Sequence, residues 1–251
     1  MRSFIVILTA LAVAPHPTGA VSPRQPVLVE LFTSEGCSSC PPADALLESL
    51  DHAQPVSGAE TVVLSEHVDY WNSLGWSDPY SSILYSNRQM AYALRFGIES
   101  VYTPQMVVDG RLQFSGADRR GVTSGIAQSA QREKIPVRIV SIVNHAPDTL
   151  LVRIQTDPAP DAELLLALAD DYDTSHVQRG ENSGRTLRHV SVVRELTRVA
   201  TLRKDRPFDS ELKVHIQKNW HIDGMRLIAI VQTRDAGPVL GAAMRRLGSN
   251  F

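Results

Sequence analysis

The chain has 251 residues, of which 43% are hydrophobic. It contains 25 lysines and arginines and 27 aspartates and glutamates. The formal net charge of −2 argues against nucleic acid as a partner, because nucleic-acid binding usually requires a basic face. The length exceeds that of a common single domain, and the hydrophobic content is sufficient for real cores, which favours two domains.

The N-terminus has the layout of a secretory signal peptide. Met1 and Arg2 precede an apolar stretch over residues 5–14, and a small-residue site ends at Ala20. This stretch is too short to cross a bilayer, which takes about 20 apolar residues, and no later segment is long enough. We therefore expect residues 1–20 to be removed and the mature chain to be exported, periplasmic or extracellular, without a membrane span.

The first half of the mature chain alternates predicted strands and helices. A buried strand over 26–32 leads into a cysteine pair, and Pro41 and Pro42 suit the opening turn of a helix that continues to Leu50. The elements expected next are a strand over 61–65, a helix over 80–96 after the caps Ser77 and Asp78, a strand directly after Pro104, an Asp109-Gly110 turn, a returning strand over 111–115 and a helix over 118–133.

From Pro136 onward the pattern changes to short strands without intervening helices. Repeated strands separated by Pro, Gly, Asn and Asp predict an antiparallel sandwich. Residues 164–168 fit a helix equally well. The predicted strands cover 137–143, 149–156, 163–169, 190–202, 210–217, 225–232 and 239–244.

Cys37 and Cys40 are the only cysteines of the chain. A disulfide that closes so small a ring stabilises a fold by only about 2 kcal/mol, so it is a poor structural staple. At a strand-to-helix junction, backbone amides and the helix dipole favour the thiolate, which is the nucleophilic form. We therefore expect an exposed Cys37 to attack and Cys40 to resolve the mixed disulfide. An inert, permanently closed pair is the alternative.

The first unit resembles the thioredoxin fold, in which a strand delivers Cys-x-x-Cys to a helix and a Thr-Pro pair precedes a final hairpin and helix. The whole mature chain is more closely similar to a family of secreted bacterial proteins known only as a domain of unknown function. The motifs that carry this likeness are CSSCPP within 31–44, HVDYWN at 67–72, LGW at 74–76, RQ at 88–89, YTPQ at 102–105, GENSGR at 180–185 and the segment 187–194. The implied fold class is an α/β thioredoxin-like domain over 24–134 followed by an all-β antiparallel sandwich domain over 136–251.

The thioredoxin resemblance also implies roles for Pro104 and Glu30. The Thr103-Pro104 bond is expected to be cis and to lie against the cysteines, where it presents backbone polar groups to a substrate strand. Glu30 lies on the strand that feeds the cysteine loop, and an acid at a similar point of thioredoxins accepts the proton of the buried cysteine. Here Glu30 is seven residues before Cys37, one more than the usual spacing. An inward side chain would have a raised pKa, whereas a surface carboxylate at the sheet edge is the alternative.

Aromatic residues gather after the second predicted strand. Eight of the fifteen aromatics fall between residues 70 and 102. We expect a groove there that holds an unfolded peptide or a small apolar ligand, although packing beneath the helix over 80–96 would explain some of them equally well. The predicted substrate-binding residues are Tyr70, Trp71, Trp76, Tyr102 and Thr103.

Two further functions remain open beside thiol–disulfide exchange with protein or small-molecule thiols. Cys37, Cys40 and His67 form a soft ligand set suited to Cu(I), which makes a periplasmic copper-binding or copper-delivery protein the first alternative. A closed zinc site would need four ligands, and no second cysteine pair exists. A non-catalytic binding module is the other alternative. For the leading hypothesis we expect no cofactor, and the sequence indicates neither redox direction, nor redox partner, nor oligomeric state.

The GENSGR segment has two interpretations. Gly and Asn suit a tight loop between strands, because both adopt positive φ at little cost. The functional interpretation is an interdomain clamp, or an anion site formed by Arg185 and Arg188.

Overall fold

The structure, a computed structural model, describes residues 24–248, and the predicted signal peptide over 1–20 lies outside this part. The predicted elements from residue 26 onward are largely confirmed, and the strand expected over 149–156 has those bounds. In chain order the elements are β1 Gln25–Thr33, α1 Pro41–Ala53, β2 Ala59–His67, a 3-10 turn at Asn72–Leu74, α2 Ile83–Phe96, β3 Gln105–Val108, β4 Leu112–Ser115, α3 Arg119–Ala130, β5 Val137–Ala146, β6 Thr149–Thr156, β7 Ala162–His176, β8 Thr186–Thr201, β9 Phe208–His215, a 3-10 turn at Ile222–Gly224, β10 Met225–Thr233 and β11 Val239–Arg246.

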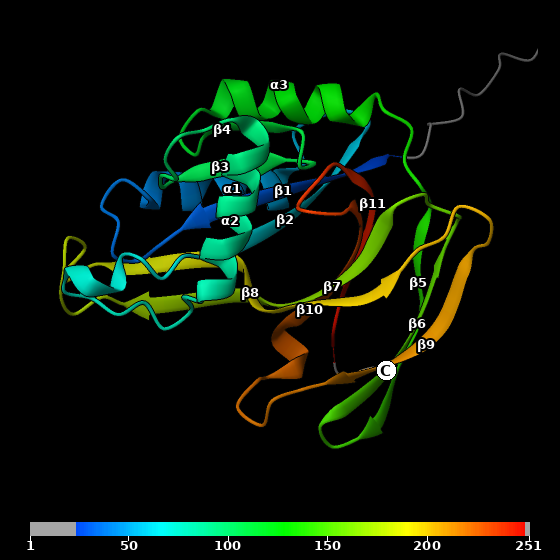
Figure 1. Cartoon of the computed structure of the whole chain (residues 1–251). Coiled ribbons are helices and arrows are strands. Elements are labelled where there is room, and N and C mark those ends of the chain that lie inside the picture. The colour runs from blue at the N-terminus through cyan, green and yellow to red at the C-terminus, as the bar shows by residue number, and fades with distance from the viewer. Residues whose placement is uncertain (1–23, 249–251) are drawn as a thin grey trace, which may run out of the picture.

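The strands form two sheets (Figure 1). The larger has eight strands in the order β11-β10-β7-β8-β2-β1-β3-β4, and the smaller has three in the order β5-β6-β9. β1 pairs in parallel with β2 and antiparallel with β3. β7 and β8 form a long antiparallel hairpin, and residues 164–168, which fitted either a strand or a helix, lie in β7.

The predicted fold class, a thioredoxin-like α/β domain followed by an all-β antiparallel sandwich, is wrong. β8 pairs in parallel with β2 through Ser65 and Val192, so one sheet contains strands from both halves of the chain. Four of the strands expected in the sandwich, β7, β8, β10 and β11, extend this sheet, and only β5, β6 and β9 form a second one. The strands themselves can be predicted from the local pattern of hydrophobic residues. The pairing of two strands that are so distant in sequence leaves no such pattern.

α2 begins three residues later than predicted. Its N-cap is Ser82, whose hydroxyl oxygen accepts a hydrogen bond from the backbone amide of Leu84. Asp78, one of the two expected caps, instead accepts from the amides of Tyr80 and Glu35. In residues 24–248, none of the helices combines the length and the apolar character that a membrane crossing requires.

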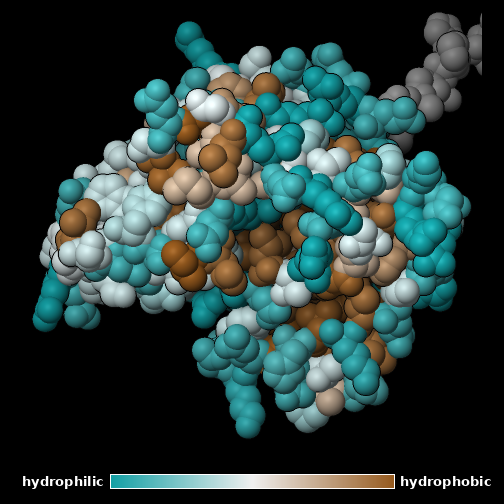
Figure 2. All heavy atoms as spheres, in the orientation of Figure 1, coloured by the Kyte–Doolittle hydropathy of each residue, from teal (hydrophilic) through white to brown (hydrophobic). Residues whose placement is uncertain are grey.

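Hydrophobic clusters lie on both faces of the larger sheet. On one face, Val29 and Leu31 of β1 pack with α1 and α3, and on the other Phe32 packs against Tyr92 of α2. The outer side of α2 carries exposed apolar side chains, and Figure 2 shows hydrophobic atoms at the surface of the face that α2 occupies. The exposed large hydrophobic residues on that helix are Ile83, Leu84, Met90 and Leu94.

The fold brings three segments together beside the cysteines. The loop over 34–40 joins the end of β1 to the start of α1. In Figure 1 the far end of the β7–β8 hairpin lies beside the segment between β2 and α2. A Cβ built on Gly75 of that segment would lie 3.6 Å from the Cα of Gly180 at the hairpin tip. Residues remote in sequence therefore enclose the cysteine loop.

Candidate functional site

Cys37 and Cys40 form a disulfide in the loop between β1 and α1, with their Cα atoms 5.4 Å apart. Cys40 is the N-cap residue of α1, and Pro41 begins the helix, as the sequence predicts. Both cysteines have 0% exposed surface, so Cys37 is not the solvent-exposed residue expected from the sequence. Ser38 and Ser39, between them, are the exposed residues of the motif.

The tip of the β7–β8 hairpin, residues 177–185, contacts the loop that carries the disulfide. The side-chain amide of Asn182 donates to the carbonyl oxygens of Glu35 (2.9 Å) and Cys37 (3.0 Å), and Asn182 is itself fully buried. The carboxylate of Glu181 accepts from the backbone amide of Ser38 at 3.1 Å. The GENSGR segment thus contacts the cysteine loop through its Glu and Asn. The anion site expected at Arg185 and Arg188 stays a prediction.

Pro104 lies next to the first turn of α1. The Thr103–Pro104 peptide bond is cis, as expected. A Cβ built on Gly116 would lie 2.6 Å from the Cβ of Pro104 and 2.8 Å from that of Ala43, so these residues meet around a position open only to glycine. Since Ala43 follows Cys40 by three residues, this contact places the proline beside the cysteine motif.

Trp71 joins the cysteine loop to the Thr103–Pro104 segment. Its indole Nε1 donates to the hydroxyl of Thr103 at 2.8 Å, and a Cβ built on Gly36 would lie 3.1 Å from the Cβ of Trp71. Trp76 donates from Nε1 to Oε2 of Glu35 at 2.7 Å. Both indoles therefore connect the segment between β2 and α2 to the cysteine loop or to the Thr103–Pro104 segment.

The two tyrosines of the predicted groove are tied to glutamines. The Tyr70 hydroxyl donates to Oε1 of Gln89 at 3.1 Å, and the Tyr102 hydroxyl donates to the side-chain oxygen of Gln113. Tyr70 keeps 38% of its surface exposed. Of the predicted substrate-binding set, it is the side chain most open to a ligand here.

Glu30 is fully buried and already has partners. One carboxylate oxygen accepts from Nε of Arg88 at 2.7 Å, and the other accepts from the hydroxyl of Tyr92 at 2.6 Å. Beside this pair, neither oxygen of the buried Glu66 has a hydrogen-bond partner, and burial raises its pKa well above the usual range. The structure therefore places Glu30 in an inward-facing ion pair, and its predicted role as proton acceptor stays a prediction.

A second buried polar group, which the sequence did not reveal, lies around the cysteine loop. We call it the acid–histidine cluster, and it consists of Glu35, Asp44, His67, Asp78 and His189. Nδ1 of His67 is 2.7 Å from Oδ2 of Asp78, and the rings of His67 and His189 are 4.7 Å apart between centroids.

Within this cluster, His189 lies between two carboxylates. Its Nε2 is 3.4 Å from Oε1 of Glu35, and its Nδ1 is 3.9 Å from Oδ1 of Asp44. Burial lowers the pKa of His189, but the two adjacent carboxylates outweigh it and raise that pKa to about 10. Glu35 and Asp44 flank the cysteine motif in the sequence, and this was the one feature from which the acid–histidine cluster could have been predicted.

The structure adds no further metal ligand to the predicted copper site. Across residues 24–248, no three His, Cys, Asp or Glu side chains are arranged to hold a metal ion. In the disulfide form the two sulfur atoms bond to each other. The set Cys37, Cys40 and His67 stays a prediction for the reduced protein.

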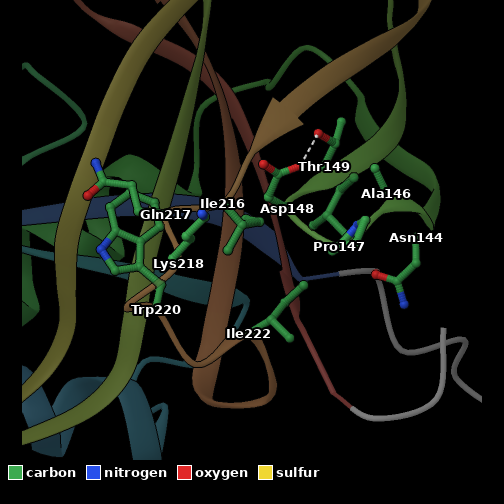
Figure 3. Close-up of a pocket in the computed structure, with 11 residues that line it drawn as sticks. Asn144, Ala146, Pro147, Asp148, Thr149, Ile216, Gln217, Lys218, Trp220 and Ile222 are labelled. Carbon is green, nitrogen blue, oxygen red and sulfur yellow. Dashed lines mark hydrogen bonds between the residues drawn. The ribbon is translucent and has the colours of Figure 1, made fainter.

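A cavity of about 360 Å³ lies elsewhere, between the β5–β6 turn and the segment before β10 (Figure 3). Trp220, Ile216 and Ile222 supply its apolar wall, while Asp148 and Lys218 supply polar groups. It contains none of the residues of the cysteine loop or of the predicted aromatic groove.

Comparison with known proteins identifies relatives by sequence and by structure. Residues 28–232 match the model of a family described as "Protein of unknown function (DUF1223)". A crystal structure of a protein from Agrobacterium tumefaciens is similar with 28% identity and a TM-score of 0.69, covering 90% of this chain and 95% of that one. A domain of the outer membrane lipoprotein Omp28 from Porphyromonas gingivalis aligns with 12% identity and a TM-score of 0.31, covering 46% of this chain and 89% of that one, a likeness too weak to support an argument. No curated protein matches the chain.

Proposed function

The chain belongs to the DUF1223 family of proteins of unknown function, and we propose that it is an exported thiol–disulfide exchange protein acting through Cys37 and Cys40. The observation that carries the proposal is the disulfide at the first turn of α1, with Pro104 beside that turn. A bond that closes so short a loop adds little to stability, so its value lies in its chemistry.

The exchange balances without any further reactant. A substrate thiolate attacks Sγ of Cys37, the bond to Cys40 breaks, and Cys40 leaves as a thiolate that takes up a proton. A second thiolate of the substrate then attacks the mixed disulfide, which releases Cys37 as a thiolate and the substrate as a disulfide. The reverse sequence reduces a substrate disulfide and oxidises the protein. The start of α1 favours the thiolate form of the nucleophile Cys37 through its amides and dipole.

Access to the disulfide requires movement of the hairpin tip. A thiolate must approach the sulfur it attacks, and neither cysteine has exposed surface in the closed form. The cover is held by Asn182 and Glu181 through contacts with the backbone of the loop. The contact of Glu181 is exposed and the two of Asn182 are buried, so opening breaks three hydrogen bonds and leaves the sheet intact, at a lower free-energy cost than global unfolding. The tip therefore acts as a gate in this proposal.

The proposal is tested by disulfide exchange with insulin and with oxidised glutathione. Mature protein, Cys37→Ser and Cys40→Ser forms are compared at equal concentration, in the presence of a thiol reductant. We expect turnover by the unaltered protein and none above background by Cys37→Ser. Equal rates for the unaltered protein and Cys37→Ser would eliminate the function.

A further inference from the structure

The acid–histidine cluster places three carboxyl groups and two imidazoles around the cysteine loop. Glu35 belongs to the loop itself, and its backbone amide donates to Oδ2 of Asp78 at 2.8 Å. The same oxygen lies against Nδ1 of His67. Asp44 lies on α1, and His189 reaches the cluster from β8. Loop, helix and hairpin therefore meet at one buried set of ionisable groups.

Several polar atoms of this cluster have no hydrogen-bond partner although they are buried. They are Oε1 of Glu35, Nε2 of His67 and both ring nitrogens of His189. An unpaired buried polar atom costs free energy, and such atoms are rare without a functional reason. These buried nitrogen and oxygen atoms are close to the disulfide and have no hydrogen-bond partner, so they can bind a proton.

Asp44 is the member of the cluster nearest to Cys40 along the helix. Cys40 has helical backbone angles, and the amide of Asp44 donates to its carbonyl oxygen at 3.1 Å. Residues four apart on a helix have neighbouring side chains on the same face, and both of these side chains are buried. The Asp44 carboxylate is also fixed by the hydroxyl of Thr33, which donates to Oδ1 at 2.9 Å.

We propose that Asp44 accepts the proton of Cys40 when this cysteine resolves a mixed disulfide, and that His189 is the positioning residue that stabilises the Asp44 carboxylate. The inference rests on the proposed function and assigns to Asp44 the role that the sequence suggested for Glu30. Glu30 already bonds to Arg88 and Tyr92, whereas the second oxygen of Asp44 is free of protein hydrogen bonds within residues 24–248.

The step balances within the site. The proton of the Cys40 thiol moves to the Asp44 carboxylate, the Cys40 thiolate attacks Sγ of Cys37, and the bond from Cys37 to the substrate sulfur breaks. The substrate leaves as a thiolate, and the proton on Asp44 passes to it or to water.

Asp44 lies among other ionisable groups of the cluster. His189 is the adjacent cation, and its raised pKa keeps it protonated at neutral pH. Glu35 and Asp78 are two further buried carboxyl groups of the cluster, and negative charge close to a cysteine disfavours its thiolate. Tyr80 packs on both histidine rings and burial raises its pKa, so it stays neutral. A resolving cysteine in such a setting needs a base at the moment of attack.

The test follows reduced protein after mixing with the chromogenic disulfide 5,5′-dithiobis(2-nitrobenzoate). The first release of thionitrobenzoate reports attack by Cys37, and the second, independent of reagent concentration, reports resolution by Cys40. We expect Asp44→Asn to slow the second phase about 100-fold near pH 7 while the first phase changes little, and the deficit to shrink at alkaline pH, where hydroxide removes the thiol proton. Asp44→Glu should recover part of the rate, and Glu48→Gln, on the same helix, is the matched control.

His189→Gln provides a second readout. This substitution removes the imidazole that lies beside the Asp44 carboxylate, so the pH profile of the second phase should shift while that of the first phase stays unchanged. A second phase unchanged in Asp44→Asn, or slowed by Glu30→Gln instead, would overturn the assignment. If Asp44→Asn does not fold, an unshifted profile in folded His189→Gln overturns it as well. Absence of a second phase in unaltered protein would reject the exchange function itself, so the two failures are distinguishable.

Discussion

Replacing Asn182 with alanine should open the cover of the disulfide. Asn182 makes two hydrogen bonds to the cysteine loop, to the carbonyl oxygens of Glu35 and Cys37. Its third bond, accepted from Arg185, stays within the hairpin tip and does not hold the cover down. At about 1 kcal/mol for each bond that crosses to the loop, the closed form loses about 2 kcal/mol relative to the open one.

This loss should appear as faster reduction. If the tip opens and closes many times before a thiol reacts, the observed rate is proportional to the population of the open form. Because 1.4 kcal/mol corresponds to a factor of ten, reduction by dithiothreitol should accelerate about 30-fold in Asn182→Ala. The assay stops the reaction with acid at timed intervals, alkylates the free thiols and counts them by mass spectrometry.

Two variants serve as controls for this measurement. Ser183→Ala alters an exposed residue of the same tip, whose hydroxyl donates to the carbonyl oxygen of Gln178 and not to the cysteine loop. Leu150→Ala removes a buried side chain from the core of β6, so it lowers global stability without touching the tip. Both should be reduced at the unaltered rate. The gate is refuted if Asn182→Ala is reduced no faster than Ser183→Ala, or if Leu150→Ala accelerates reduction as much.

Three further predictions concern the surroundings of the site. The stabilisation that protonated His189 provides is complete below its ordinary pKa of about 6.5 and is lost as the pH rises towards its folded-state pKa of about 10. The difference in unfolding free energy between the unaltered protein and His189→Gln, measured in urea, should therefore become smaller over that pH range. Arg88→Met leaves the Glu30 carboxylate buried without its cation and should cost about 3–5 kcal/mol in the same assay, whereas a cost below about 1 kcal/mol would contradict the burial of the pair. Gly116→Ala inserts a methyl group against Pro104 and should lower stability by about 1–3 kcal/mol, and an unchanged thermal midpoint would show that these segments do not pack as described.

The elements could be predicted because their signals are local. Pro41 and Pro42 at the opening of α1, and the alternating burial of β6, depend on neighbouring residues only. The late start of α2 is instructive, because Asp78 is a good N-cap by composition. Its carboxylate is used by Glu35 and His67, both outside the helix, so Ser82 takes the capping role.

The site could be predicted only in part for the same physical reason. The cysteines and Pro104 belong to compact motifs, and the cis bond at Thr103–Pro104 followed from them. The cover and the cluster depend on Asn182 and His189, which meet the cysteine loop from more than a hundred residues away. Cys37 is fully buried in this setting, and no property of the CSSC motif indicates it.

One hairpin supplies both the cover and the cation of the site, which links access to proton transfer. Ser191 of β8 has a φ of 51°, which is unusual for a residue with a side chain. Beyond this point toward the sheet, Val192 pairs with β2, and the carbonyl oxygen of Val193 accepts from the buried hydroxyl of Tyr85, so that part of β8 is held at its position. His189 lies on the other side, on the arm that leads to Asn182. Bending at Ser191 would therefore lift the tip from Cys37 and move His189 relative to Asp44 in the same motion, whereas fraying of the tip alone would expose the sulfur atoms and leave the cluster intact.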